Sequence, residues 1–527
     1  MDRILCCVTR QDSRKVNKTI GLETFEERRT RWRSIRLMYL TMFVMSTGFT
    51  IILTAVWPYL TKLDPNVGKE FLGFVTAAGP LAETIFSPIL GYWSNKSGSA
   101  RQPLLATLAL MVMASAGYSL LEAFPASTAK YWMIITRFLI GVSAANVTVI
   151  RSYISAATTL DERTGATSIL ALCQVMGYIF GPVVQSILTS LLGNDGFPII
   201  EDFISMNMYT SVGWVIVVLS SINFVLLLPQ FFTEQHIAVR EEMKTQGIST
   251  LLPDSQPVWK KSKLDYLAAF SLIFGYFVLV FNIALLENLG IPIVMDQFAW
   301  TNEQAVYYMG IVMAVGAIIS VTVIALLKFV CKYISEANLV IYGGFLFMFI
   351  GRLAYIPWGD APPQLQFSHE HNLTSAVGCP VVEQPWCEFT PAMTLPQVLI
   401  GYLFLSIGYP IGVTLLFSIF SKILGPRPQG VWMGLMMGTG SFARALGSIV
   451  LSIMYVELGT TLTFSITSVM ILAYGVWLVL VHKRLKPNDR AVLASPRQVR
   501  MIVLKENMNG KGGNAPIADE ERQALRQ

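Results

Sequence analysis

The residues from Asp265 to Leu289 read DYLAAFSLIFGYFVLVFNIALLENL, an apolar stretch whose only charged residues lie near its two ends. About 20 consecutive apolar residues are enough for a helix to cross the hydrocarbon core of a bilayer, which is about 30 Å thick. The stretch therefore predicts a membrane-spanning helix.

Eleven further apolar stretches surround this one. The chain of 527 residues is 53% hydrophobic and only 14% charged, whereas soluble globular domains carry about 25% charged residues. This composition excludes an ordinary soluble enzyme, a disordered scaffold and a disulfide-rich secreted domain. We predict an all-α membrane protein with twelve transmembrane helices in two six-helix halves. The expected spans are 37–60, 71–93, 103–123, 131–156, 165–192 and 208–230, then 265–289, 304–328, 336–358, 395–420, 431–456 and 461–482.

The charged residues collect between the spans and predict how the chain is organised. We expect a basic N-terminal segment (1–36), a six-helix half (37–230), a linker (231–264), a second half (265–482) with a long loop at 359–395, and a tail (483–527). Lys and Arg favour cytoplasmic loops. With twelve spans, only Lys62, Lys69 and Lys130 fall in loops on the side opposite the termini. Both termini and the linker are therefore expected in the cytoplasm, and the long loop in the lumen or outside.

A polar loop after the second span carries a distinctive pattern, Gly91-Tyr-Trp-Ser-Asn95-Lys96-Ser-Gly98-Ser-Ala-Arg101. It resembles the signature loop of the major facilitator superfamily, in which a glycine precedes an acid and an arginine, and a second glycine precedes a basic pair. Here Asn95 stands where the family usually has aspartate, and Lys96 where it has arginine. Asparagine can still cap a helix, but it cannot form the ion pair that the resemblance implies for the aspartate.

Two further motifs lie in spans where the same family has them. Arg137-Phe-Leu-Ile-Gly141 is in the fourth span, and Gly177-Tyr-Ile-Phe-Gly181-Pro182 is in the fifth. Small residues four positions apart let helices approach closely, and proline removes a backbone donor and can bend a span. The resemblance implies two six-helix halves that rock about a binding site near the middle of the membrane.

Four other stretches narrow the resemblance to one lysosomal branch of the superfamily. They are Trp32-Arg-Ser-Ile-Arg36, Asn146-Val-Thr-Val-Ile-Arg151-Ser-Tyr153, Ala299-Trp-Thr-Asn-Glu303-Gln-Ala305 and Ser421-Lys-Ile-Leu-Gly425-Pro-Arg-Pro-Gln-Gly430. The resemblance implies an endosomal or lysosomal membrane and an association with chloride permeation. The acidic dileucine signal that this branch carries near its start is missing here, so the plasma membrane remains the alternative.

Ionisable residues inside spans mark candidate positions on a transport pathway, because a charge within the bilayer is costly. Glu83 lies in the second span, Arg137 in the fourth and Arg444 in the eleventh. The resemblance implies that the fourth span lines the cavity and that the second and eleventh flank it. Glu83 suits a proton carrier, with a carboxylate that has no coupling role as the alternative. The two arginines suit anion binding, with structural ion pairs as the alternative.

Three more charged residues of the spans favour a structural interpretation. Arg352 and Glu287 lie nearer the ends of their spans, where long side chains extend to the interface. Arg151 lies close to the expected cytoplasmic face and is interpreted as an anchor rather than a ligand.

Together these features predict a membrane transport protein that moves an anion, either chloride or a small organic anion, with coupling to protons left open. Two alternatives remain: an uncoupled chloride conductance, and a membrane scaffold or receptor that transports nothing. The sequence has no serine–histidine–acid set, phosphate loop or zinc spacing. We therefore expect no enzymatic activity, no cofactor, no metal and no nucleic acid partner, only a small substrate and the lipid bilayer.

The long loop at 359–395 carries two expected modifications. It contains no Lys or Arg and holds the sequon Asn372-Leu-Thr374, which is an acceptor for N-glycosylation. It also contains Cys379 and Cys387, and the non-cytoplasmic side is the one that oxidises thiols. We expect one glycan at Asn372 and a disulfide between the two cysteines.

Overall fold

The computed structural model describes residues 22–64, 69–192, 197–200, 204–245, 264–359, 362–366, 378–381, 384–425 and 427–485. The chain divides into one unit that ends at Leu485 and a second unit, Lys486–Gln527, which lies outside the described residues. The expected glycosylation site at Asn372 and most of the expected tail also lie outside them, as do residues 1–21 and 246–263 of the N-terminal segment and the linker.

The first half of the chain forms seven long or medium helices. They are α2 (Phe25–Leu63), α3 (Lys69–Ser97), α4 (Arg101–Ser119), α5 (Ala126–Ala144), α6 (Val147–Ala156), α7 (Leu160–Leu192) and α8 (Thr210–Leu226), with the short η1 (Leu121–Ala123) and an antiparallel pair of strands, β1 (Phe197–Ile200) and β2 (Ile204–Met206). The linker contributes α9 (Ile237–Thr245).

The second half repeats this helical arrangement. Its elements are α10 (Tyr266–Phe298), α11 (Asn302–Val330), α12 (Glu336–Asn338), the π-helical η3 (Leu339–Leu346), α13 (Phe347–Ala354), α14 (Leu395–Leu424) and α15 (Gly430–Leu485). The loop before α14 contains a parallel pair of strands, β3 (Leu365–Gln366) and β4 (Cys379–Pro380), and the short η4 (Pro385–Glu388).

The prediction of twelve spans in two halves is confirmed. Nine helical stretches among the described residues are long and apolar enough to cross a membrane. One of them, α15, contains two spans, because Gly459 interrupts it with φ 76° and ψ −177°. This left-handed backbone conformation is readily accessible only to glycine. The shorter helices α4 and α8 supply the remaining two spans.

Two spans depart from the expected continuous helices. The fourth span is divided into α5 and α6 at Ala145 and Asn146. The first span begins earlier than expected, at Phe25, because Thr24 and Glu27 form a capping box that starts α2. The Thr24 hydroxyl accepts a hydrogen bond from the Glu27 backbone at 3.2 Å, and the Glu27 carboxylate accepts one from Thr24 at 2.8 Å. Part of the expected N-terminal segment is therefore helical.

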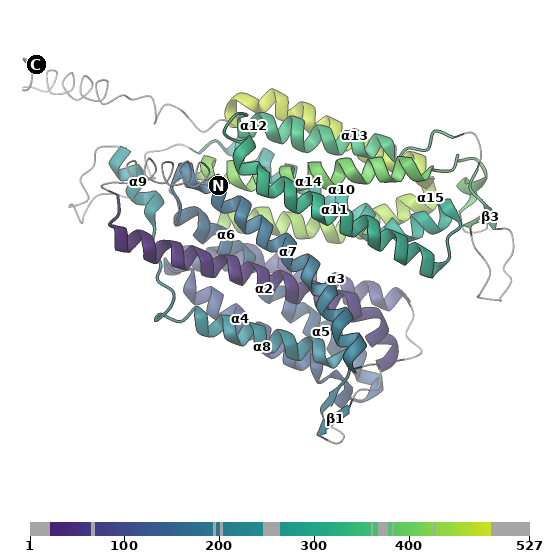
Figure 1. Cartoon of the computed structure of the whole chain (residues 1–527), viewed down its shortest axis with the longest axis horizontal. Coiled ribbons are helices and arrows are strands. Elements are labelled where there is room, and N and C mark those ends of the chain that lie inside the picture. Colours follow the sequence, from purple (N-terminus) through teal and green to yellow (C-terminus); the bar gives the residue numbers. More distant parts are fainter. Residues whose placement is uncertain are drawn as a thin grey trace, which may run out of the picture. The chain divides into compact units, whose positions relative to one another are not determined.

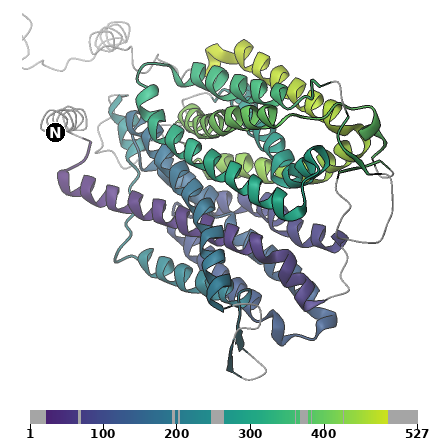
Figure 2. The same ribbon diagram turned by 45° about the vertical axis from the view of Figure 1, so that its right-hand side comes forward.

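The helix bundle has two ends, and we name each after a feature found at it. Figure 1 shows α9 and α12 at one end of the bundle and β1 and β3 at the other. We call the first the linker end, and the second the disulfide end, since a disulfide joins Cys379 to Cys387 there. In Figures 1 and 2 the purple-to-blue helices of the first half lie beside the green-to-yellow helices of the second.

The glycines of the fourth and fifth spans allow close packing within the first half. A Cβ atom on Gly177 of α7 would lie 2.6 Å from the Cβ of Ser46 on α2, and one on Gly141 of α5 would lie 2.7 Å from the Cα of Gly79 on α3. Real Cβ atoms do not come this close, so only glycine permits these two helix contacts. Pro182 lies inside α7 and is exposed on its surface.

A candidate substrate cavity between the two halves

A cavity of about 360 Å³ lies between the two halves and is lined by both of them. Ligand sites in proteins commonly measure about 300–1,000 Å³. The lining is mainly apolar and aromatic, and its large side chains include Phe49, Tyr178, Tyr276, Met313, Tyr402 and Tyr409. The charged residues of the described lining are Glu83 and Arg151 from the first half and Glu287 and Arg444 from the second.

Arg151 places a buried positive charge in this cavity. It lies on α6, after the break in the fourth span, and only 4% of the residue is exposed. Its Nη2 donates a hydrogen bond to Gln174 at 2.7 Å, and its guanidinium carbon lies 3.9 Å from the centre of the Phe417 ring. Among the described residues, its Nε and Nη1 have no hydrogen-bond partner. These two donors are available to an anion.

Arg444 differs from Arg151 because it has a carboxylate beside it. Its Nε lies 3.5 Å from Oε2 of Glu287, a residue of the same half. The Glu287 side chain is 45% exposed, so water reaches this level of the cavity. The Glu287 carboxylate partly offsets the charge of Arg444, although Nε of Arg444 makes no hydrogen bond within the described part of the chain.

Glu83 lines the cavity beside residues of both halves. It lies on α3 of the first half, and Ser441 on α15 of the second half lines the same cavity. The charges of Arg444 and Arg151 both act on its carboxylate. The Glu83 carboxylate therefore experiences the positive charge of one arginine from each half.

Arg137, the other predicted pathway arginine, is placed elsewhere. It is 2% exposed on α5 and is not among the residues that line the cavity. Its Nε has no hydrogen-bond partner in the described part of the chain. The cavity receives Arg151 instead, so the interpretation of Arg151 as an anchor near the membrane surface was wrong.

The other two residues interpreted as structural also differ from expectation. Arg352 does not extend to the interface: it is fully buried on α13 and donates a hydrogen bond to the backbone carbonyl of Asn282. Its guanidinium carbon lies 5.8 Å from the centre of the Phe464 ring. Glu287 lines the cavity as the partner of Arg444. The positions of Arg352 and Glu287 along their spans did not reveal these contacts, because the contacts depend on which neighbouring helix packs against each residue.

The signature loop joins the two halves at the linker end. Oδ1 of Asn95 accepts a hydrogen bond from the backbone of Gly430 at 2.9 Å, and its Nδ2 donates to the carbonyl of Pro428 at 3.4 Å. A Cβ on Gly430 would lie 2.6 Å from this Oδ1 and 3.0 Å from the carbonyl carbon of Gly91. Asn95 therefore caps the N-terminus of α15 from the opposite half.

The rest of the signature loop forms the turn between α3 and α4. Gly98 has φ 64°, and Lys96 is exposed. The backbone N–H of Arg101 donates to Oε1 of Glu234 at 2.8 Å. These residues attach the loop to the segment that leads into the linker.

A second group of contacts closes the linker end beside the signature loop. Nη1 of Arg163 on α7 donates to the backbone carbonyl of Ser421 on α14 at 3.1 Å. The hydroxyl of Thr164 contacts Glu336, which also accepts from Nζ of Lys422 at 2.6 Å. With the Asn95 contacts, they close the cavity toward the linker end.

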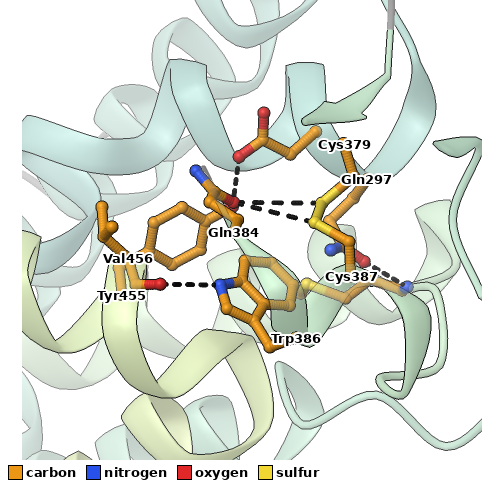
Figure 3. The surroundings of a disulfide bond; sticks show 9 residues. Gln297, Cys379, Gln384, Trp386, Cys387, Tyr455 and Val456 are labelled. Carbon is orange, nitrogen blue, oxygen red and sulfur yellow. Dashed lines mark hydrogen bonds between the residues drawn. A yellow bond between two sulfur atoms is a disulfide. The ribbon is translucent and has the colours of Figure 1, made fainter. Parts of the chain in front are cut away.

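The disulfide end is organised by the long loop (Figure 3). Cys379 and Cys387 are joined, with their Cα atoms 6.0 Å apart. Nε1 of Trp386 donates to the carbonyl of Val456 at 3.1 Å, and a Cβ on Gly459 would lie 2.7 Å from the indole. The loop thus packs against the turn between the last two spans.

Comparison with known sequences identifies the family. A profile of the Major Facilitator Superfamily matches residues 38–365. The chain is 36% identical over 485 residues to major facilitator superfamily domain-containing protein 8 of Xenopus laevis, which covers 88% of this chain and 94% of that protein. It is 26% identical over 155 residues to tetracycline resistance protein, class E, of Escherichia coli, which covers 29% of this chain and 36% of that one.

Solved structures share the fold. The human organic anion transporter MFSD10 matches with a TM-score of 0.60 at 15% identity, over 85% of this chain and 99% of that one. The proton:xylose symporter XylE matches with a TM-score of 0.62 at 14% identity, over 86% of this chain and 95% of that one. Identities this low support the fold alone. Together with the sequence match, they show that this chain is a multi-pass membrane transporter and belongs to the major facilitator superfamily.

Proposed function

We propose that this transporter moves a small organic anion and that Arg151 binds its negative charge. The observation that carries the proposal is the state of Arg151: it is buried in the cavity, and two of its donors have no partner among the described residues. Arginine stays charged in any protein setting, and a buried charge is stable only when it is compensated. An anionic substrate supplies that compensation.

The size and lining of the cavity favour an organic anion over chloride. A volume of about 360 Å³ far exceeds what one monatomic ion needs. Aromatic rings such as Tyr276 and Tyr409, together with Phe49, pack well against an apolar or aromatic body. We infer a carboxylate or similar anion that carries such a body. No enzymatic step, cofactor or metal is part of this proposal.

Proton coupling through Glu83 follows from the charges of the cavity. Two arginines and two carboxylates give the described lining a net charge of zero when all are ionised. Protonation of Glu83 raises this net charge to +1 and removes the electrostatic attraction between Glu83 and the two arginines. An acidic compartment on the substrate side would therefore favour binding of the anion, and a neutral compartment its release.

The distribution of basic residues supports an orientation. Arg28, Arg33 and Arg36 lie in the first turns of α2 at the linker end, and Arg484 lies at the end of α15. Because basic residues favour the cytoplasmic side, we infer that the linker end is cytoplasmic and that the disulfide end faces a lumen or the exterior. The resemblance of the Trp32–Arg36 and Asn146–Tyr153 stretches to a lysosomal branch favours an endolysosomal membrane.

Flux through purified protein in liposomes tests the proposal. The probes are labelled benzoate and indole-3-acetate, with chloride in parallel, under an inwardly directed proton gradient. Hydrogen bonds to charged groups contribute about 1.5–3 kcal/mol, so Arg151→Gln is expected to lower organic anion uptake by about ten- to a hundredfold.

Arg137→Gln is the matched control, since Arg137 is equally buried on the same span but does not line the cavity. It should retain uptake at equal protein abundance. Equal losses in both variants would remove Arg151 from substrate binding. Chloride current without organic anion uptake in the unmodified protein would favour the uncoupled conductance, and no flux of any anion would favour a scaffold.

A further inference from the structure

A second, much smaller cavity lies on the linker side of Arg151. Its volume is about 10 Å³, which is about the space that one water molecule needs. Arg151 borders both cavities, whereas Phe417 borders only the smaller one. The remaining lining includes Thr167 from α7 and Ser155 from the end of α6. Arg151 is thus the boundary between the substrate cavity and the closed linker end.

The Phe417 ring lies directly against this boundary. Its centre is 3.9 Å from the guanidinium carbon of Arg151, a distance typical of a close cation–π contact. The ring also packs edge to face against Tyr276, with centroids 5.0 Å apart. Phe417 is 1% exposed. One aromatic side chain of the second half therefore covers the cation that the first half contributes.

Polar groups of the two halves meet beside the ring on the linker side. The hydroxyls of Ser155 and Ser421 are hydrogen-bonded to each other across the two halves. The guanidinium of Arg163 donates to the carbonyl of Ser421 at 3.1 Å. Hydroxyl and guanidinium donors do not repel an anion, so the aromatic ring adds an apolar barrier that these polar groups do not supply.

We propose that Phe417 is the inner gate of the transporter: its ring holds Arg151 in place at the boundary between the two cavities, and its loss turns coupled transport into an uncoupled anion conductance. This inference rests on the proposed role of Arg151 in anion binding. The attraction between ring and guanidinium depends on the positive charge of Arg151. An anion bound at Arg151 offsets that charge and weakens the contact. The gate therefore opens when an anion is bound at Arg151 and stays closed when none is bound.

The first experiment measures access directly. The four cysteines outside the disulfide are replaced by Ser, and Thr167→Cys introduces one thiol in the smaller cavity. A small anionic methanethiosulfonate reagent is applied from the disulfide end. Modification should be at least about ten times faster when Phe417→Ala is added, because the ring no longer holds Arg151 in place between the two cavities.

Phe420→Ala is the matched control, because Phe420 is fully buried on the same helix and borders neither cavity. It should leave the modification rate unchanged. Equal rates in the Phe417→Ala and Phe420→Ala backgrounds would overturn the gate. If Phe417→Ala reduces protein abundance, Phe417→Leu replaces it, because leucine keeps an apolar side chain without the cation–π contact. The modification rate of Thr167→Cys should then be intermediate. A rate equal to that measured with Phe417 intact would also overturn the gate.

The second experiment separates the gate from the proposed function. In liposomes, Phe417→Ala should carry an anion current that follows voltage and the anion gradient and ignores the proton gradient, at least about tenfold above the unmodified protein. If the unmodified protein transports anions but Phe417→Ala shows no such current, the gate is wrong and the function stands. If neither protein moves any anion while the Thr167→Cys thiol still becomes accessible, the function is wrong and Phe417 remains a barrier.

Discussion

Nε of Arg444 lies 3.5 Å from Oε2 of Glu287, whereas Arg151, across the same cavity, forms no salt bridge with any residue that the structure describes. The two arginines thus have different surroundings, although both line one site. Arg444 has a carboxylate beside it in its own half. Arg151 depends on Gln174 and the Phe417 ring for its contacts, and it is the one that an anion would complete.

Removing the Glu287 charge should make the cavity more attractive to anions. Glu287→Gln frees Arg444 and adds one positive charge to the lining, so KM for organic anion uptake should fall several-fold. Glu457→Gln is the control, because Glu457 is exposed on α15 and does not line the cavity. Initial uptake rates over a range of benzoate concentrations measure the effect. An unchanged KM would mean that Arg444 does not contact the substrate.

Glu83 should set the pH dependence of flux. Uptake by the unmodified protein is expected to rise as the pH on the disulfide side falls, because protonation of Glu83 removes a negative charge beside Arg444 and Arg151. Glu83→Gln resembles the protonated state and should keep its flux with a flat pH profile. Glu287→Gln should keep the pH dependence of uptake that the unmodified protein shows. A normal profile in Glu83→Gln would assign the proton to another group.

Gly430→Ala should destabilise the closed linker end. Its Cβ would lie 2.6 Å from Oδ1 of Asn95, so the hydrogen bond between the two halves must lengthen or break. Loss of one such hydrogen bond shifts the equilibrium between the closed and open linker end by about 1 kcal/mol, or roughly fivefold. Labelling of single cysteines near the linker end should increase accordingly. Gly310→Ala is the control, since nothing lies within 4 Å of its Cβ; equal labelling in both would contradict the proposed closure.

The disulfide should stabilise the second half. It closes a loop with a sequence separation of 8 residues, for which chain-entropy estimates give about 2–3 kcal/mol. The double variant Cys379→Ser/Cys387→Ser should therefore melt several degrees lower in detergent, and reductant should lower the melting temperature of the unmodified protein in the same way. Cys173→Ser, which removes a free cysteine, should have a smaller effect. Labelling of Cys379 by maleimide without reduction would disprove the bridge.

A glycan at Asn372 would establish the sidedness of the disulfide end. Expressed in animal cells, Asn372→Gln should migrate faster on a gel, to the position that glycosidase treatment gives the unmodified protein. Asn95 also lies in a sequon, Asn95-Lys-Ser97, but at the linker end, so Asn95→Gln should leave mobility unchanged. A shift with Asn95→Gln and none with Asn372→Gln would reverse the proposed orientation.

The sequence by itself determined the spans and the family. A bilayer imposes both a length and an apolar composition on each crossing, so α10 and α14 are recognisable from local sequence alone. The close approaches at Gly141 and Gly177 were also predictable, because spacing of small residues directly encodes how near two helices can come.

Only the tertiary structure decided which charges face the cavity. Arg137 and Arg151 are roughly four helical turns apart, so an unbroken helix would place both on nearly the same face. In the folded protein Arg151 on α6 lines the cavity, whereas Arg137 on α5 is buried outside its lining. The periodicity of a single span carries no information about its depth, its breaks or its neighbours, because those depend on contacts with helices far away in the sequence.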